Sequence, residues 1–464
     1  MSPTPAPKGT TTSSHRLART EPPPPVRIVH LGLGAFFRAH LAWYTQHAPD
    51  AGQWGIAAFT GRTATAAREI AAQDGLYTLV TRGARGDTTE VIRSVAAVHA
   101  STEHDAFLRY LRDPAVAVLS LTVTEAGYCT SARGGLDLAR DDVRADIRAL
   151  RADHLAPVTT VPARVLAAVL ARHDAGLHPV AVVSCDNVPG NGAVTARVVR
   201  DLAAEIAPDL PDLVDRADFV STVVDRITPR ATAQDRASLA LETGRHDAVP
   251  VVTEPFSEWV LQGEFACGRP SWESVGARFV ADLAPFEQRK LWLLNGAHSL
   301  LAYAGGVRGH RTVAEAVADP RCLQEVQQWW DQVQPHLGLP REEVAAYRSA
   351  LLGRFANPRI RHELAQIAVD GSVKLPVRVL PVLRAERAAG RGPGAAAQVL
   401  AAWVLHLRGA GPPVVDAHAG ELEPLARGPL EAAVRAVLGR WGPDLAADDT
   451  LVRSTVDAAA GLTH

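Results

Sequence analysis

The sequence feature that most restricts the fold is an apolar strand pattern that runs directly into a glycine turn. Residues 26–31 read VRIVHL, the turn Gly32-Leu33-Gly34 follows at once, and a helical pattern covers residues 39–46. Similar apolar runs at 54–59, 116–124 and 179–184 are separated by Ala/Leu/Arg-rich helical stretches such as 161–172. Strands that alternate with helices form parallel sheets covered on both faces. We therefore predict an α/β domain with a parallel sheet in the first part of the chain.

The pattern changes beyond residue 282, where helices are expected at 287–304, 323–334, 341–354, 395–407 and 430–440. A chain of 464 residues is also too long for one ordinary core. Residues 1–25 are rich in proline and lack an apolar signal-peptide segment, so a disordered tail is predicted there. The expected parts are this tail, a dinucleotide-binding domain over 26–282 and a mainly helical, substrate-binding domain over 283–464.

The charge balance and the cysteines exclude several classes of function. The formal net charge is −2, so no excess charge favours nucleic acid or an acidic membrane. The four cysteines form no Cys-x-x-Cys pair, which argues against a disulfide framework and against a zinc site. No apolar stretch approaches the ~20 residues that span a bilayer. We expect a cytoplasmic protein that acts on small molecules without a metal, as a monomer or small homo-oligomer.

Lysine is scarce in this chain, and the positions of the lysines are informative. Only Lys8, Lys290 and Lys374 occur among 48 lysine and arginine residues. Arginine can replace lysine as a surface cation, but a guanidinium stays charged near neutral pH and cannot replace a lysine that must lose a proton. Lys290 is therefore a candidate base. The alternative is that these three lysines remain by chance.

The Gly32-Leu33-Gly34 turn lies where a dinucleotide-binding fold brings its backbone close to a pyrophosphate. Phe37 takes the third position of the Gly-x-Gly-x-x-Gly pattern, so the pattern is incomplete, and a glycine turn after a strand is also common elsewhere. The acidic residue that usually ends the second strand is missing, since Thr60, Gly61 and Arg62 follow residues 54–59. Arg62 could accept the 2′-phosphate of NADP, or it could be an exposed loop arginine. The expected cofactor is NAD or NADP.

A second group of candidate residues lies in 286–298, which reads FEQRKLWLLNGAH. At about 100° per residue, Lys290, His298 and Asn295 fall at about 0°, 80° and 140° around a helix and can line one side of a cleft. A lysine there can take the proton of a substrate alcohol, and an asparagine amide can donate a hydrogen bond to the developing oxygen. The alternative is a solvated lysine on an amphipathic helix with a core histidine.

The segment 184–192, SCDNVPGNG, closes an apolar strand at the edge of the sheet where α/β folds bind ligands. Asn187 is expected to point toward the ligand. Asp, Asn, Pro and Gly also favour turns, and this explanation suits Asn191 better than Asn187.

Seven motifs resemble those of the mannitol dehydrogenase family of long-chain polyol and sugar-acid dehydrogenases, and they occur in the order in which the family has them. They extend over nearly the whole chain from about residue 27 and read IVHLGLGAFFRAH (28–40), SLTVTEAGY (120–128), SCDNVPGNG (184–192), VVDRITP (223–229), TEPFSEWV (253–260), FEQRKLWLLNGAHS (286–299) and NPRIRHELAQIAVDGSVKLPVR (357–378). The resemblance implies an N-terminal Rossmann-type domain, a largely helical C-terminal domain and a cleft between them. Phe37 and Ala126 depart from the family, which usually has His and Lys at these positions.

The resemblance also implies roles for individual residues. Lys290 matches the general base, Asn295 and His298 belong to the same motif, and Asn187 matches a second polarising amide. Lys374 matches a substrate-contacting lysine, and Glu287 matches a glutamate that assists proton exchange with solvent. The candidate cofactor contacts are Gly32, Gly34, Phe36, Arg62, Thr124, Glu125, Val224 and Asp225.

Within the family, the motifs look most like the fructuronate reductase, or D-mannonate oxidoreductase, branch. Gln366 stands where mannitol 2-dehydrogenases typically carry Arg, and Arg361 or Lys374 could bind a uronate carboxylate, although a surface position explains Arg361 better than a substrate contact. The alternatives are a dehydrogenase of mannitol, arabinitol or another neutral polyol, and a dinucleotide-binding sensor without catalysis. A Tyr-x-x-x-Lys mechanism is excluded, since the residues four positions before Lys290 and Lys374 are Phe286 and Asp370.

Overall fold

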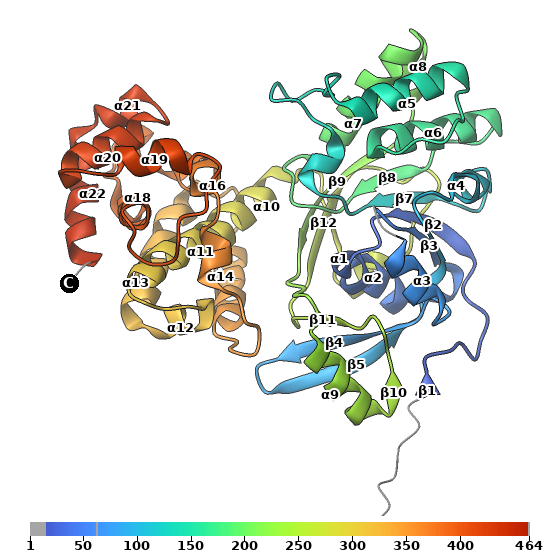
Figure 1. The fold of residues 1–464 in the computed structure, drawn as a ribbon, viewed down its shortest axis with the longest axis horizontal. Coiled ribbons are helices and arrows are strands. Elements are labelled where there is room, and N and C mark those ends of the chain that lie inside the picture. The colour runs from blue at the N-terminus through green and yellow to red at the C-terminus, as the bar shows by residue number, and fades with distance from the viewer. Residues whose placement is uncertain (1–14, 62–63, 463–464) are drawn as a thin grey trace, which may run out of the picture. The chain divides into compact units, whose positions relative to one another are not determined.

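The computed structural model describes residues 15–61 and 64–462. Contacts divide the chain into two compact units, unit 1 (Met1–Leu283) and unit 2 (Ala284–His464). In Figure 1 the strands lie in unit 1, and the ribbon of unit 2 is helical.

Unit 1 is built on an eight-stranded sheet in the order β13-β12-β9-β8-β7-β2-β3-β6. Its strands are β2 (Val26–Leu31), β3 (Gly55–Phe59), β6 (Val95–His99), β7 (Val118–Leu121), β8 (Ala181–Ser184), β9 (Phe219–Asp225), β12 (Glu258–Gln262) and β13 (Arg278–Phe279). The six neighbouring strands β9, β8, β7, β2, β3 and β6 are parallel to one another. Strand β12 runs antiparallel to β9. The order reverses between β2 and β7, as in a Rossmann fold. The predicted α/β Rossmann-type fold is confirmed.

The side chains of each parallel strand alternate between two cores, because successive residues of a strand point to opposite faces. Val29 and Leu31 pack in the core that is covered by α4 (His104–Leu111), α5 (Asp141–Ala152), α6 (Val161–Asp174) and α7 (Asn191–Ile206). Ile28 packs in the other core, which is covered by α1 (Ala35–Ala39), α2 (Leu41–His47) and α3 (Thr65–Ala71). Figure 1 shows these two helix layers on opposite faces of the sheet.

Unit 1 also contains a three-stranded sheet that the sequence patterns did not indicate. It has the order β11-β4-β5 and consists of β4 (Tyr77–Gly83), β5 (Gly86–Ile92) and β11 (Val251–Thr253). Val80 and Val252 of this sheet bury Leu239 of α9 (Ala233–Thr243). A short helix, α8 (Leu210–Val214), follows α7.

The prediction of a disordered tail over 1–25 is wrong for residues 15–25. β1 (His15–Arg16) pairs in parallel with β10 (Arg245–His246). Leu17 is buried, and the Arg19 guanidinium donates hydrogen bonds to the carbonyl oxygens of Asp74, Arg93 and Val95. One buried leucine and one multiply bonded arginine thus attach this proline-rich segment to unit 1. The rest of the predicted tail, residues 1–14, lies outside the described residues.

Unit 2 is mainly helical, as predicted. Its α-helices are α10 (Ala284–Arg289), α11 (Gly296–Leu300), α12 (Val313–Ala318), α13 (Pro320–Val333), α14 (Arg341–Phe355), α15 (Leu364–Ala368), α16 (Gly371–Arg378), α17 (Leu380–Ala388), α18 (Gly394–Leu407), α19 (Ala419–Leu425), α20 (Leu430–Gly439), α21 (Pro443–Ala446) and α22 (Asp449–Leu462). The almost wholly apolar α18 is buried on nearly all sides, as expected for a helix without a polar face. The single helix predicted over 287–304 is interrupted, because residues 290–295 and 301–305 are π-helical.

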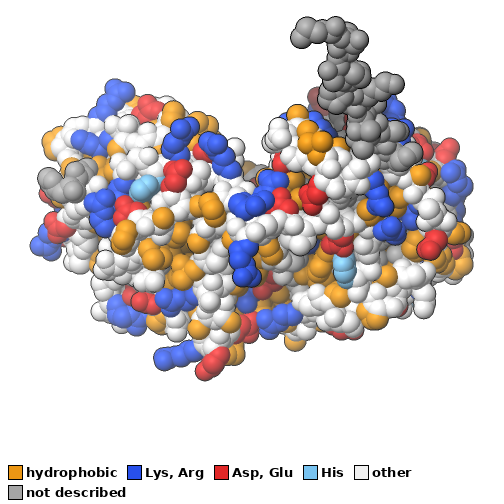
Figure 2. Space-filling view, turned by 90° about the horizontal axis from the view of Figure 1, so that it is seen from below, with side chains coloured by type: hydrophobic (Ala, Val, Ile, Leu, Met, Phe, Trp, Pro, Cys, Tyr) orange, Lys and Arg blue, Asp and Glu red, His pale blue; other side chains and the backbone are white. Residues whose placement is uncertain are grey.

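The surface fits the small net charge. Figure 2 shows acidic and basic side chains interspersed over the face that it draws. Among the described residues, no helix combines the length and the apolar character needed to cross a bilayer.

Gly32 provides a test of the glycine turn. Its φ is +111°, and an added Cβ would lie 2.2 Å from the carbonyl oxygen of Thr122. Gly32→Ala is expected to lower the free energy of unfolding by about 2–4 kcal/mol, through backbone strain and this clash. Urea unfolding followed by circular dichroism measures the change. Gly52→Ala is the control, because a Cβ at Gly52 meets nothing within 4 Å. Equal stability of the two variants would contradict the proposed constraint.

Candidate functional site

The loops that follow the parallel strands of unit 1 line two adjoining cavities. One cavity of about 470 Å³ lies among the segments after β2, β7 and β8, and another of about 610 Å³ extends to the segment after β3. The two cavities share Thr122, Val123 and Thr124. Ligands of open α/β sheets bind at this carboxyl edge, where the strand order reverses.

Most of the predicted cofactor contacts lie together at these cavities. Gly34, Phe36, Thr124, Glu125 and Val224 line the smaller cavity, and Gly32 lines the larger one. Asp225 is buried at the end of β9, directly after Val224. Arg62 lies outside the described residues.

The glycine turn leaves room for a ligand beside the backbone. Gly32 has no space for a side chain, whereas a Cβ on Gly34 would meet nothing closer than the Gly32 carbonyl oxygen at 3.7 Å. The small size of Gly34 is therefore not needed for packing within the protein, and it leaves the backbone open toward the cavity. Such a turn fits a dinucleotide pyrophosphate, which needs close approach of the backbone.

Phe37, which replaces the third glycine, packs against a buried histidine that the sequence patterns did not single out. The His30 and Phe37 rings stack with centroids 3.7 Å apart and an interplanar angle of 10°. The His30 nitrogens also lie 2.8 Å from Ser120 Oγ and 3.0 Å from Thr122 Oγ1. Burial lowers the pKa of His30 to about 3. A neutral imidazole therefore joins β2 to the start of the loop after β7.

The two asparagines of the 184–192 segment have different environments. Asn191 is fully buried, where its amide donates to the Thr222 carbonyl oxygen at 3.2 Å and its Oδ1 accepts from the Gly192 and Thr222 amides, both at 2.9 Å. Asn191 thus attaches the start of α7 to β9, which is a structural role rather than the turn that its residue type suggested. Asn187 is exposed and lines the smaller cavity. Asp186 precedes it and accepts a hydrogen bond from the Tyr128 hydroxyl.

In unit 2, the structure changes the expected geometry of the Lys290 motif. Residues Lys290–Asn295 form a π-helix, in which the Gly296 amide donates to the Leu291 carbonyl oxygen. With hydrogen bonds from i+5 to i, residues five positions apart lie about one turn apart on the same side. The assumed rotation of about 100° per residue is therefore wrong here, and Asn295 is aligned with Lys290 more closely than α-helical geometry gives. Both residues are partly exposed.

Two indoles and one glycine stabilise this π-helical segment. Trp329 and Trp330 of α13 donate hydrogen bonds to the carbonyl oxygens of Trp292 (2.8 Å) and Leu293 (2.9 Å). These bonds supply partners where the backbone ladder changes its pattern. A Cβ on Gly296 would lie 2.7 Å from Trp329 Nε1, so this glycine lets the indole approach. π-Helical turns occur frequently at functional sites.

His298 follows this segment and is deeply buried. Its ring packs against Phe355 and His362, each with centroids 4.9 Å apart. Burial, followed by the nearby His362, Arg354 and Arg378, holds the pKa of His298 well below its usual value. Its Nε2 has no hydrogen-bond partner among the described residues. A neutral imidazole with an unpaired nitrogen suits hydrogen bonding to a substrate hydroxyl, because a buried polar atom without a partner is costly.

A second group of cations lies on α16. Arg378 donates to Ser299 Oγ at 3.1 Å and to the Asn295 carbonyl oxygen at 3.4 Å, which attaches α16 to the Lys290 motif. Lys374 lies one turn earlier and donates to the Ile367 carbonyl oxygen at 3.2 Å. Burial, together with repulsion from Arg378, lowers the pKa of Lys374. The sequence patterns identified Lys374 but not Arg378, although Arg378 closes the same motif.

The remaining predicted substrate contacts have other surroundings. The Arg361 side chain is 69% exposed and its Nε lies 2.5 Å from Glu363 Oε1. This ion pair matches the surface alternative for Arg361. Glu287 is partly exposed on α10, one turn before Lys290. The intervening Arg289 is buried and pairs with Glu343 of α14 at 3.0 Å, which fixes the start of the motif.

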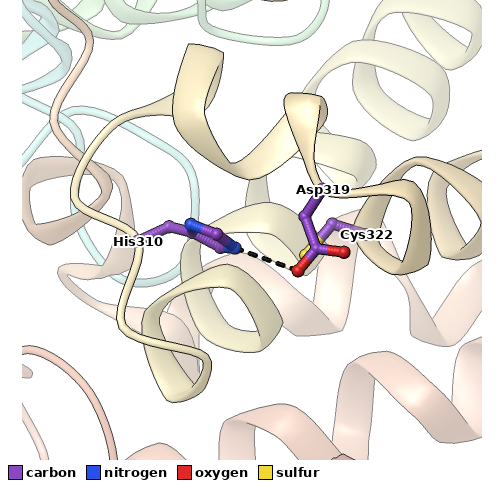
Figure 3. A group of neighbouring side chains, drawn as sticks. All are labelled: His310, Asp319 and Cys322. Carbon is purple, nitrogen blue, oxygen red and sulfur yellow. Dashed lines mark hydrogen bonds and ion pairs between the residues drawn. The ribbon is translucent and has the colours of Figure 1, made fainter.

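One other cluster in unit 2 contains metal-ligating types of side chain. The three residues are His310, Asp319 and Cys322. An imidazole nitrogen, a carboxylate oxygen and the sulfur of these side chains all lie within 4.8 Å of one another (Figure 3). Asp319 Oδ2 lies 3.1 Å from His310 Nε2, and its Oδ1 caps α13 through the Arg321 amide. Cys322 Sγ lies 3.3 Å from a nitrogen of Arg308, which also binds Glu325. These hydrogen bonds and the adjacent guanidinium account for the cluster without a cation.

Known proteins resemble this chain over both units. The model of the mannitol dehydrogenase Rossmann domain matches residues 26–274, and that of the mannitol dehydrogenase C-terminal domain matches residues 282–458. D-mannonate oxidoreductase of Escherichia coli (strain K12) is 37% identical over 82% of this chain and 80% of its own length. D-sorbitol dehydrogenase in substrate-free form is 28% identical, with a TM-score of 0.87 over 96% of this chain and 95% of its own. Pseudomonas fluorescens mannitol 2-dehydrogenase, in a ternary complex with NAD and D-mannitol, is 31% identical, with a TM-score of 0.77 over 97% and 93%.

Buried His30 predicts how stability depends on pH. Its pKa of about 3 in the folded protein lies below the ordinary value of 6.5, so between these values the unfolded chain binds a proton that the folded chain does not. This contribution to stability is complete above pH 6.5 and decreases as the pH falls, by up to about 1.4 kcal/mol per pH unit. His30→Gln should reduce the pH dependence of urea unfolding between pH 7 and 5, whereas His173→Gln, at an exposed position, should not. An unchanged pH dependence in His30→Gln would contradict this role.

Proposed function

Because the chain belongs to the mannitol dehydrogenase family, we propose that it is an NAD(P)-dependent oxidoreductase that interconverts D-fructuronate and D-mannonate. The reaction interconverts a secondary alcohol and the corresponding ketone. Lys290 acts as the base, and no metal ion takes part. The observation that carries the proposal is the π-helical Lys290 motif with its partly exposed lysine and amide, followed by a buried histidine that has an unpaired nitrogen.

The two adjoining cavities of unit 1 support the assignment of NAD(P) as the cofactor. Gly32 and Gly34 would hold the pyrophosphate, and Thr124, Glu125 and Val224 would line the rest of the dinucleotide site. When bound, NAD(P) supplies or accepts the hydride. Asn187, at the exposed end of the loop after β8, would donate a hydrogen bond to the substrate oxygen.

The proposed proton transfer uses groups of unit 2. In the direction of alcohol oxidation, the neutral amine of Lys290 accepts the hydroxyl proton. The Asn295 side-chain amide stabilises the oxygen from which the proton leaves, and none of the described residues hydrogen-bonds to this amide. Neutral His298 orients a substrate hydroxyl through Nε2. Glu287, one turn from Lys290, would pass the proton between this amine and solvent.

The cations around the motif favour a sugar acid over a neutral polyol. Lys374 and Arg378 lie on the same side of α16, one turn apart, and Arg378 contacts the Lys290 motif. A uronate carboxylate would compensate this charge through charge-assisted hydrogen bonds. The second candidate is a neutral polyol, which is supported by the named substrates of the two structural relatives and by the surface ion pair of Arg361. We also propose that the protein acts in the cytoplasm.

Lys290 is the first test of the proposed function. Lys290→Ala and Lys290→Arg should each lower kcat by at least about 100-fold, since an arginine keeps the charge but cannot accept the proton. NADH and NADPH binding, measured by fluorescence titration, should change little in either variant. Turnover should persist after treatment with a chelator. Near-normal turnover in Lys290→Arg would contradict the assignment of the base.

Substrate choice gives a second test. The ratio kcat/KM is expected to be higher for fructuronate than for fructose or xylulose, with either reduced cofactor. Lys374→Met should lower kcat/KM for fructuronate about 10- to 100-fold more than for fructose, because it removes a cation that only the uronate needs. A neutral ketose that exceeds fructuronate in wild type would favour the polyol alternative.

A further inference from the structure

Arg164 is a buried arginine whose hydrogen-bonding capacity is largely unused. It lies on α6, is 6% exposed and lines the larger cavity of unit 1. One of its guanidinium nitrogens, Nη2, donates to the Ser101 carbonyl oxygen. Its buried Nε has no hydrogen-bond partner among the described residues. A guanidinium offers five N–H donors, so this burial is costly unless a ligand supplies further acceptors.

Ser101 connects this guanidinium to the end of β3. The Ser101 amide donates to Thr60 Oγ1 at 3.0 Å, and the carbonyl oxygen of the same residue accepts from Arg164. Thr60 and Gly61 directly follow β3 and line the same cavity. In dinucleotide-binding folds, the residue at this strand end contacts the adenosine ribose, and an acidic residue there binds its 2′-hydroxyl. Arg164 therefore lies in the same cavity as the strand end at which an NAD-specific protein would place a carboxylate.

The acidic groups near Arg164 are already engaged by other donors. Asp146 accepts hydrogen bonds from the amides of Thr159 (3.0 Å) and Thr160 (2.8 Å) and from the Thr160 hydroxyl (2.7 Å). Asp142 lines the cavity but forms an ion pair with Arg140 at 2.6 Å. Neither carboxylate hydrogen-bonds to Arg164, although Asp146 lies near enough to interact with its charge, so the remaining N–H groups of the guanidinium are available to an anionic ligand.

We propose that Arg164 forms a subsite for the 2′-phosphate of NADP, so that the protein prefers NADP(H) to NAD(H). The phosphate would accept charge-assisted hydrogen bonds from Nε and from the free N–H groups of the guanidinium. The Thr160 and Thr60 hydroxyls border the same cavity. This inference rests on the proposed function only for the presence of a dinucleotide site, because it does not depend on the sugar substrate.

The test compares two nucleotides that differ only in the 2′-phosphate, 5′-AMP and 2′,5′-ADP, by calorimetric titration of the full-length chain. Wild type should bind 2′,5′-ADP about 10- to 100-fold more tightly than 5′-AMP. Arg164→Met should bring the two affinities within about threefold of each other, and Arg164→Lys should retain part of the preference because it keeps the charge. The affinity for 5′-AMP should stay nearly constant in these variants.

Arg172→Met is the matched control. Arg172 is buried on the same helix, but its guanidinium donates to the carbonyl oxygens of Leu111 (3.2 Å), Asp113 (3.3 Å) and Val116 (3.1 Å) and does not line the cavity. This variant should lose stability and keep the nucleotide preference. If Arg164→Met does not fold, the wild-type comparison and Arg164→Lys still decide.

Three outcomes would overturn the inference. Equal affinities for the two nucleotides in wild type would remove the subsite, and an unchanged preference in the folded Arg164 variants would assign it to other residues. Binding of neither nucleotide would overturn the dinucleotide site and the proposed function together. A preference for 2′,5′-ADP without turnover of any sugar would refute only the proposed function.

Discussion

The cavities of unit 1 depend on one close approach of two backbone segments. Gly32, directly after β2, lies so near Thr122, directly after β7, that no side chain fits between them. These strands are neighbours at the point where the strand order reverses, so their loops separate in opposite directions and leave space at the carboxyl edge. Neutral His30 connects the same two segments, because its Nε2 lies 3.0 Å from both the Gly32 carbonyl oxygen and Thr122 Oγ1. The two cavities meet at this contact.

In unit 2, the candidate groups of the Lys290 motif lie on one continuous helical segment. A regular α-helix turns residues 290 and 295 to different sides, whereas a π-helical turn aligns them. Such turns leave the backbone ladder irregular. The indoles of Trp329 and Trp330 compensate by binding two of its carbonyl oxygens, and Gly296 gives one of them access. The proposed catalytic geometry therefore depends on residues that have no role in the chemistry.

Among its described residues, each unit has a buried nitrogen atom without a partner beside its proposed site. His298 Nε2 and Arg164 Nε are each buried and lack a hydrogen-bond partner among the described residues. By contrast, buried Asn191 and Arg172 have their polar atoms bound by backbone groups, and both serve the packing of unit 1. An unsatisfied polar atom costs folding free energy, so its retention beside a cavity or a proposed catalytic motif is best explained by a ligand that completes its bonds. Arg308 Nε and Trp259 Nε1 also lack partners within the described part of the chain, so an unpaired nitrogen indicates a ligand only together with an adjacent cavity or the proposed catalytic motif.

The sequence by itself indicated the alternating strands and helices of the parallel sheet, the helical character of unit 2, the glycine turn and the residue types of the Lys290 motif, because these follow from local periodicity and from the scarcity of lysine. Only the tertiary structure decided the π-helical register of Lys290 and Asn295, since that register depends on tryptophans more than 30 residues away in the chain. Arg164 could not be distinguished in the sequence from the other arginines of an arginine-rich helix. Its importance comes from Ser101, which connects it to the end of β3 across 63 residues of sequence. Contacts between distant segments are not encoded in local patterns, and they decide which polar groups remain unpaired.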